Sequence, residues 1–449
     1  GERFALHDYP LNQMFGVQSQ LPTFLATQHP VATEGEARDY LARLRKIPVA
    51  AGQVMEGLEA REAAAILPPT FVVEKVLAEM RAFTGAPATD NVLYTSFAER
   101  LDKLDGDTLS ADDRAALLDE AEAAIAGQVY PAYQTFIEYY DDLLPRTTGN
   151  HGVWALPDGQ AYYAWAARMH TSTDMTPAQI HQLGLDEVAR LEAEMDAILV
   201  AEGLVEGSIG ERVQQIASRP DQLYPDTDEG RAAIIADFTS IIEEIDAGLD
   251  GVFNVRPKQG VKVERVPAFR EKTAPGAYYN PPAFDGSRPG IFYINLRNTA
   301  EVARFGMRTL AYHEAIPGHH FQTTIQQELT GVPTFRKILP FTAFSEGWAL
   351  YAERLAWEEG FQQQPLDNLG RLQAEMFRAV RLVVDTGMHD QRWTREQAIA
   401  YMLDKTGMPE TDVVAEIERY LVMPGQALAY KVGMNKILEL RARAQAALG

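Results

Sequence analysis

Residues 176–199 read TPAQIHQLGLDEVARLEAEMDAIL and carry apolar side chains at positions i, i+3, i+4 and i+7, which is the spacing of one helix face. Thr176 precedes Pro177, and Gln179 stands three residues after Thr176, as is typical of a helix start. The same period recurs over residues 36–44, 111–126, 230–248, 301–312, 344–359, 366–386, 394–405, 410–420 and 424–447. The sequence therefore predicts a mainly α protein built from many helices.

One region departs from the helical period. Three short segments each follow a glycine, and they read VKVERV (261–266), AYYN (277–280) and IFYIN (291–295). We expect them to form the strands of one small sheet that lines a cleft. A composition dip at residues 144–159 predicts a seam between an N-terminal helical part (1–150) and a catalytic helical part (151–449) with the β insertion at about 260–296. One continuous unit is the alternative.

Composition and charge exclude several classes of protein. The chain has 449 residues and a net charge of −22, which disfavours partners such as nucleic acids and anionic membrane surfaces. It contains no cysteine, which excludes disulfide scaffolds, thiolate metal sites and cysteine nucleophiles. It has no apolar run of about 18 residues, so no membrane span is expected. The sequence does not indicate an oligomeric state.

Three of the nine histidines lie close together in the stretch HEAIPGHH (residues 313–320). Two neutral imidazoles on neighbouring helical turns can hold Zn²⁺, and Glu314 beside the first can take a proton from the attacking water. The usual spacing is HExxH, but here Pro317 occupies the position of the second histidine. In a straight helix His313 and His319 would be about 9 Å apart along the axis and could not share one ion.

A local loop-out resolves this spacing problem. Pro317 cannot donate to the carbonyl of His313, and Gly318 tolerates unusual dihedral angles. A loop-out of two residues would bring His319 into the second ligand position, and a loop-out of three would bring His320 there. We prefer His319, with His320 as the alternative ligand.

A second motif supplies the third metal ligand. Residues 345–353 read SEGWALYAE and follow a linker that contains Gly331 and Pro333. Glu346 is the expected carboxylate ligand, and three protein ligands leave a fourth position for water, as a catalytic zinc requires. Glu353 lies two turns further along the same helix face, where it can orient a ligand histidine.

The sequence resembles the DUF885 family. The resemblance rests on HE-x-x-PGH, SEGWALYAE, RLVVDTGMH and PGQALAYK, together with GVWALPDG, YYAWAARMHTSTDMTP and GAYYNPP. DUF885 is a large, mostly bacterial group with many exported or lipoprotein members, considered related to the glutamate-type zinc metallopeptidases. The resemblance implies a helical metallopeptidase-like fold centred on His313, Glu314, His319 and Glu346. Together with the start at Gly1 rather than Met, the resemblance favours a processed periplasmic or exported protein, with a lipoprotein as one form of it, over a cytoplasmic protein.

Several further residues are candidates for supporting roles. Arg381, Asp385 and His389 form one helical stripe in which Asp385 pairs with Arg381 and orients His389, and His389 donates to the oxyanion. The alternative is a surface salt-bridge stripe. Tyr430 is a second candidate oxyanion donor, or a core residue. The candidates for substrate binding are Arg381 and Lys431, through a substrate carboxylate, and the strand residues Tyr279 and Asn280, through an extended peptide.

These residues together predict a zinc-dependent hydrolase. We expect a metallopeptidase that cleaves small peptides, with Zn²⁺ as cofactor and Glu314 as general base. The first alternative is a zinc amidohydrolase that acts on a small non-peptide amide or ester. The second is a helical binding protein that keeps the motif without catalysis.

Overall fold

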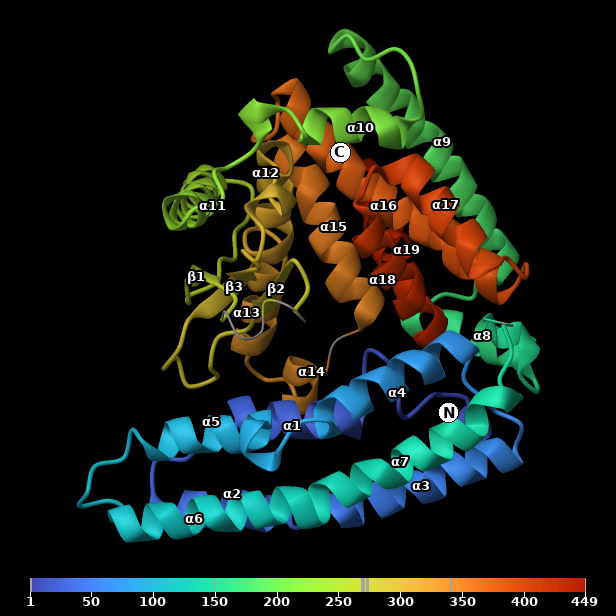
Figure 1. Ribbon diagram of the computed structural model, residues 1–449. Coiled ribbons are helices and arrows are strands. Elements are labelled where there is room, and N and C mark those ends of the chain that lie inside the picture. Colours follow the sequence, from blue (N-terminus) through green and yellow to red (C-terminus); the bar gives the residue numbers. More distant parts are fainter. Residues whose placement is uncertain (1, 150, 268–270, 272–273, 340, 449) are drawn as a thin grey trace. The chain divides into compact units, whose positions relative to one another are not determined.

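The computed structural model describes residues 2–149, 151–267, 271, 274–339 and 341–448, and it confirms a mainly helical protein with a small sheet (Figure 1). The chain forms two compact units, Gly1–Tyr162 and Tyr163–Gly449. The division falls between Tyr162 and Tyr163 rather than at the predicted seam after residue 150. All predicted site residues belong to the second unit.

The first unit consists of helices that pack side by side. They are α1 (Val17–Thr27), α2 (Glu34–Leu44), α3 (Ile47–Ala63), α4 (Thr70–Thr84), α5 (Val92–Leu101), α6 (Ala111–Ala124) and α7 (Tyr130–Leu143). A π-helical segment, Ile125–Val129, joins α6 to α7. Aromatic side chains fill the interior, and Tyr40 stacks on Phe97 with ring centroids 4.5 Å apart.

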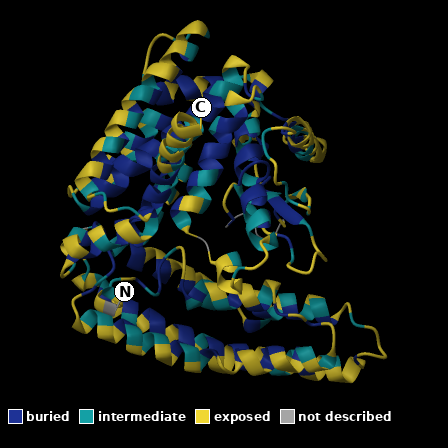
Figure 2. Cartoon of the chain, turned by 180° about the vertical axis from the view of Figure 1, so that it is seen from behind, coloured by how far each residue is buried: buried dark blue, intermediate teal, exposed yellow. Residues whose placement is uncertain are grey.

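The second unit begins within α8 (Gly159–Thr171) and contains the longest helices. These are α9 (Pro177–Ala201), α10 (Ile209–Ala217), α11 (Asp228–Gly248), α12 (Arg304–Glu314), α13 (His319–Glu328), α14 (Thr334–Ile338), α15 (Thr342–Glu358), α16 (Pro365–His389), α17 (Arg395–Thr406), α18 (Glu410–Val422) and α19 (Ala429–Leu448). The C-terminal two-thirds of α16 is almost entirely buried, so this helix forms the centre of the unit. Seen from behind, helices of the chain show exposed and buried sides (Figure 2).

The predicted helix starts are confirmed where a capping box is present. The side chain of Thr176 accepts from the backbone of Gln179, and Thr394 does the same with Gln397. The prediction for residues 424–447 is wrong at its start, because α19 begins at Ala429 after a 3-10 turn, Gln426–Leu428. The backbone N–H of Gly425 donates to the carboxylate of Asp385 instead of entering a helix.

The three predicted strands are confirmed and form one sheet. They are β1 (Val261–Arg265), β2 (Ala277–Asn280) and β3 (Gly290–Ile294), in the order β1-β3-β2. β1 pairs with β3 in parallel and β2 pairs with β3 antiparallel. Phe292 of the central strand meets Phe238 of α11 edge to face, at 5.3 Å between ring centroids. The sheet thus packs on the same core as α11 and α12.

Within the described residues, no helix has the length and apolarity needed to cross a membrane.

Candidate metal centre

The two histidines of the first motif come from two separate helices. His313 lies at the end of α12 and His319 opens α13. A Cβ at Gly318 would lie 1.9 Å from the backbone oxygen of His313, so only glycine allows the chain to turn this closely. The chain therefore reverses between the histidines, where we had expected one kinked helix with a loop-out. The two imidazole rings lie 4.8 Å apart between centroids, at 88° to each other.

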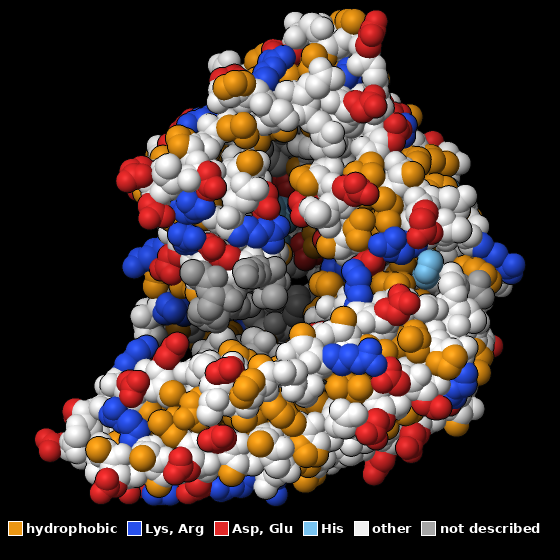
Figure 3. Space-filling model, in the orientation of Figure 1, with side chains coloured by type: hydrophobic (Ala, Val, Ile, Leu, Met, Phe, Trp, Pro, Cys, Tyr) orange, Lys and Arg blue, Asp and Glu red, His pale blue; other side chains and the backbone are white. Residues whose placement is uncertain are grey.

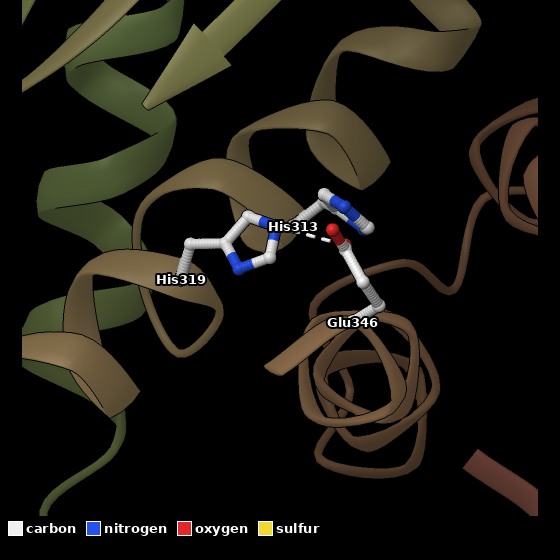
Figure 4. A group of neighbouring side chains, drawn as sticks. All are labelled: His313, His319 and Glu346. Carbon is white, nitrogen blue, oxygen red and sulfur yellow. Dashed lines mark ion pairs between the residues drawn. The ribbon is translucent and has the colours of Figure 1, made fainter. Parts of the chain in front are cut away.

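Glu346 of α15 joins these two histidines (Figure 4). Nε2 of His319 lies 3.3 Å from Oε2 of Glu346, and one ligand atom from each of His313, His319 and Glu346 lies within 4.8 Å of the others. A tetrahedral zinc with bonds of about 2.0–2.1 Å separates its ligand atoms by about 3.3 Å. The donor set and its spacing therefore fit a zinc ion after a small contraction.

A buried carboxyl group orients the first histidine. Nδ1 of His313 lies 2.7 Å from Oε1 of Glu353, and the two side chains are only 4% and 2% exposed. This contact leaves Nε2 of His313 as the nitrogen for a metal. Burial raises the pKa of Glu353 to about 8, and burial together with the charge of His319 holds the pKa of His313 well below its usual value.

The remaining groups of the cluster influence one another electrostatically. Burial opposes the charge on His319, but the adjacent Glu346 raises the pKa of His319. Burial also works against the charge on Glu346, yet His319, Arg381 and Tyr430 lower the pKa of this carboxyl group. Burial raises the pKa of Glu314, and the charge of His319 opposes that rise. Glu314 thus lies close enough to His319 and Glu346 to feel their charges.

His320 lies outside the cluster and has other partners. Its Nδ1 lies 2.9 Å from the hydroxyl of Tyr279 and 3.3 Å from that of Thr324. Its Nε2 lies 2.9 Å from the carbonyl of Gln259. Burial lowers the pKa of His320 to about 4. The structure therefore brings His319 to the other ligands and uses His320, with Tyr279, to attach the sheet to α13; Asn280 is exposed at the end of β2.

The predicted stripe on α16 has different partners from those we expected. Arg381 pairs with Glu416, at 3.0 Å between Nη2 and Oε2, and not with Asp385. Asp385 accepts from the hydroxyl of Tyr163 at 2.5 Å. Nε2 of His389 lies 3.0 Å from the carbonyl of Tyr420. All three stripe residues are buried, so the alternative of a surface salt-bridge stripe is wrong.

Lys431 and Tyr430 follow each other on α19 and have different surroundings. The ammonium of Lys431 lies 2.5 Å from Glu375 and 3.2 Å from Glu187. Two carboxylates of the protein therefore already pair with the ammonium group that we had expected to bind a substrate carboxylate. Tyr430 instead lies beside the cluster, since its phenol contributes to the lowered pKa of Glu346 after the larger effects of burial and His319.

Sequence reasoning missed Arg378. Burial and His319 lower the pKa of His313, and the charge of Arg378 adds to this effect. The same charge acts on Glu314 and, after the larger effect of burial, on Glu353. Arg378 precedes Arg381 by one helical turn, so the helical period could have pointed to it once Arg381 was chosen.

Two of the helices that carry the cluster, α13 and α15, also line an open apolar groove with a volume of about 930 Å³. Trp348 lines this groove and donates from Nε1 to the carbonyl of Pro317, in the turn between the two histidines. Figure 3 shows a narrow hollow on one face of the second unit, in the region of α12 and α15. The main apolar lining residues are Phe321, Ile325, Phe335, Phe341, Phe344 and Trp348.

The fold and the cluster define a mainly helical protein with a partly buried centre of two histidines and one glutamate. The chain belongs to the DUF885 family, described as bacterial protein of unknown function, which it matches over residues 2–449. The resemblance seen in the sequence is thereby confirmed at the level of the family. No curated protein matches the chain significantly.

Two solved structures share the fold. The first is the crystal structure of "the putative lipoprotein from Colwellia psychrerythraea", with 42% identity and a TM-score of 0.93, covering 99% of this chain and 76% of that chain. The second is that of "a putative lipoprotein of unknown function from Shewanella oneidensis", with 17% identity and a TM-score of 0.73, covering 100% of this chain and 79% of that chain. At that identity the second likeness concerns the fold alone.

Proposed function

We propose that this protein is a zinc-dependent hydrolase that cleaves peptide bonds of small peptides. The observation that carries the proposal is the convergence of His313, His319 and Glu346 within 4.8 Å, directly beside Glu314. Two imidazoles, one carboxylate and an open fourth position are the ligand set of a catalytic zinc. When bound, zinc would supply the Lewis acidity that polarises water and the substrate carbonyl.

The residues of the chain have distinct roles in this proposal. Glu314 takes a proton from the attacking water and passes it to the leaving amine. Its pKa, raised by burial, favours an acceptor that can later donate. Tyr430 donates a hydrogen bond from its hydroxyl to the carbonyl oxygen, where negative charge develops. Glu353 holds the ring of His313 by its Nδ1.

The cellular location is part of the same proposal. The similar structure from Colwellia psychrerythraea is that of a putative lipoprotein. We propose that this chain likewise acts outside the cytoplasm, in the periplasm or as an exported lipoprotein.

Glu314→Gln tests the function most directly. Zinc content by elemental analysis and cleavage of a mixed peptide library by mass spectrometry are measured for the native protein and the variant. We expect about one zinc per chain in both, and peptide cleavage by the native protein only. Cleavage that survives in Glu314→Gln would refute the assigned base. Full zinc with no peptide cleavage, but with cleavage of amides or esters, would favour a non-peptide amidohydrolase.

A further inference from the structure

Two arginines of α16 lie on the faces of the same aromatic rings. The guanidinium carbons of Arg378 and Arg381 lie 5.9 Å and 4.4 Å from the centroid of the Tyr430 ring. They lie 5.1 Å and 4.0 Å from that of Phe377. The two cations are one helical turn apart and are held together by these rings, although like charges at this spacing repel.

Both guanidinium groups keep buried donors without a partner. Arg381 is 5% exposed and donates through Nε to the hydroxyl of Tyr420 and through Nη2 to Glu416. Its Nη1 is buried and has no hydrogen-bond partner, and the same is true of Nε of Arg378. Buried donors are normally satisfied, because an unpaired one costs free energy. These nitrogens therefore indicate a ligand that accepts hydrogen bonds.

Carboxylates of the described residues satisfy these arginines only in part. Glu416 is shared between Arg381 and Arg419, at 3.0 Å and 2.9 Å. Among the described residues Arg378 makes no ion pair, and its Nη1 donates to the neutral carbonyl of Ala374. Arg378 thus has no carboxylate of its own among the described residues, and Arg381 shares Glu416 with Arg419. An anionic ligand fits such incompletely paired guanidinium groups better than a neutral acceptor does.

The two arginines border the metal cluster. Tyr430, on which both arginines lie, contributes to the low pKa of Glu346 after burial and His319. After burial and His319, the charges of Arg378 and Arg381 also lower the pKa of the ligand His313. An anion bound to the arginines would therefore lie next to the hydrolytic centre.

We propose that Arg378 and Arg381 form a subsite for the free C-terminal carboxylate of a peptide, so that the enzyme cleaves bonds close to the C-terminus. The inference rests on the proposed peptidase function. The planar guanidinium fork is the side chain best suited to hold a carboxylate through two parallel hydrogen bonds. Lys431 takes no part, because Glu375 and Glu187 already hold its ammonium.

One tripeptide in three forms tests the subsite: the free acid, its C-terminal amide, and an amide whose last residue is glutamate. kcat and KM are measured for the native protein and for Arg378→Met, Arg378→Lys and Arg381→Lys. Arg443→Met is the control, because the side chain of Arg443 is 71% exposed and lies near the end of α19. Zinc content and melting temperature show which variants are folded. Calorimetric titration of the same peptides into the native protein and into Glu314→Gln measures their affinities. The Glu314→Gln titration measures binding without turnover.

We expect the free acid to exceed its amide by about 10–100-fold in kcat/KM, the effect of one charge-assisted contact. Arg378→Met lowers the ratio of acid to amide toward one, mainly through the KM of the acid, Arg378→Lys restores part of that ratio, and Arg443→Met changes nothing. Equal cleavage of acid and amide by the native protein would overturn the subsite while the hydrolase stands. Tighter binding of the acid without any cleavage would support the subsite and refute the hydrolase.

The third peptide separates a terminal carboxylate from one on a side chain. If the amide ending in glutamate is cleaved as well as the free acid, the assignment to the C-terminus is overturned. Equal binding of all three peptides to folded Glu314→Gln would overturn the subsite without reference to activity.

Discussion

Nδ1 of His313 lies 2.7 Å from Oε1 of Glu353, although the two residues are 40 positions apart in the sequence. Glu353 stands two helical turns after Glu346 on α15, so one helix supplies both a ligand of the cluster and the group that orients another ligand. This arrangement fixes the His313 ring with its Nε2 available to the cluster. A contact of this kind sets the tautomer and the ring orientation of a metal-binding histidine.

Removal of that contact should weaken zinc binding. We expect Glu353→Ala to lower zinc affinity about 10–100-fold, and Glu353→Gln to lower it less, because the amide oxygen can still accept from Nδ1. Competition with a chromophoric chelator measures the affinity. Native affinity in Glu353→Ala would show that the ring needs no such support.

The two neighbouring histidines should differ sharply when each is replaced. His319→Ala removes a ligand atom 3.3 Å from Glu346, so we expect most of the zinc to be lost, as in His313→Ala and Glu346→Ala. His320→Ala should keep its zinc, because His320 contacts Tyr279 and Gln259 instead. Elemental analysis after dialysis decides between them. Zinc loss confined to His320→Ala would reverse the assignment.

Asp385 should make folding stability depend on pH. Burial raises its pKa from the ordinary 3.8 to about 7, against the hydrogen bonds of Tyr163 and Gly425. The folded state therefore holds this proton more tightly than the unfolded state, and its stability contribution falls as pH rises from about 4 to about 7. Asp385→Asn lacks the group. Its stability relative to the native protein should rise by about 2–4 kcal/mol between pH 5 and pH 8.

Urea unfolding of both proteins with zinc removed measures this difference. His389 is shifted in the opposite direction, since burial lowers its pKa to about 4, but it is present in both proteins and cancels in the comparison. A difference in stability that stays constant from pH 5 to pH 8 would contradict the raised pKa of Asp385.

The close packing of α15 on α19 should be sensitive to a single methyl group. A Cβ at Gly433 would lie 1.9 Å from the backbone oxygen of Ala343, so Gly433→Ala must push apart the helices that carry Glu346 and Tyr430. We expect a loss of about 1–3 kcal/mol or more, measured as a lower melting temperature, together with weaker zinc binding. Gly306→Ala on α12 is the matched control, because a Cβ there meets nothing within 4 Å. Equal melting temperatures for the two variants would contradict this packing argument.

Local patterns in the sequence predicted the elements of this fold well. The helical period and the capping boxes at Thr176 and Thr394 predicted helices that the structure contains. Glycines and alternating side chains predicted the three strands. These signals succeed because they depend on neighbouring residues. The start of α19 was missed because the hydrogen bond from Gly425 to Asp385 joins positions far apart in the chain.

The candidate site divides in the same way. Sequence spacing pointed to His313, His319 and Glu346 and left His320 as the alternative. It also suggested a pair between Arg381 and Asp385, which are four residues apart on one helix. The structure gives Arg381 to Glu416 of α18 and Asp385 to Tyr163 of α8. Spacing along one helix identifies only those partners that lie on the same helix. Because α16 is buried, neighbouring helices also contact it and supply the partners that the structure shows.

The sequence by itself determined the helical class, the three strands, the family and the residue types able to hold a metal, because each of these is written in local spacing and residue chemistry. Three features follow from the tertiary structure alone: which of two adjacent histidines meets Glu346, the pairing of Lys431 with Glu375, and the position of Arg378 over the ring of Tyr430. Each of those outcomes depends on which surfaces α12, α15, α16 and α19 bury against one another. A buried charge without a partner costs folding free energy, so the fold places a partner beside each buried charge where it can.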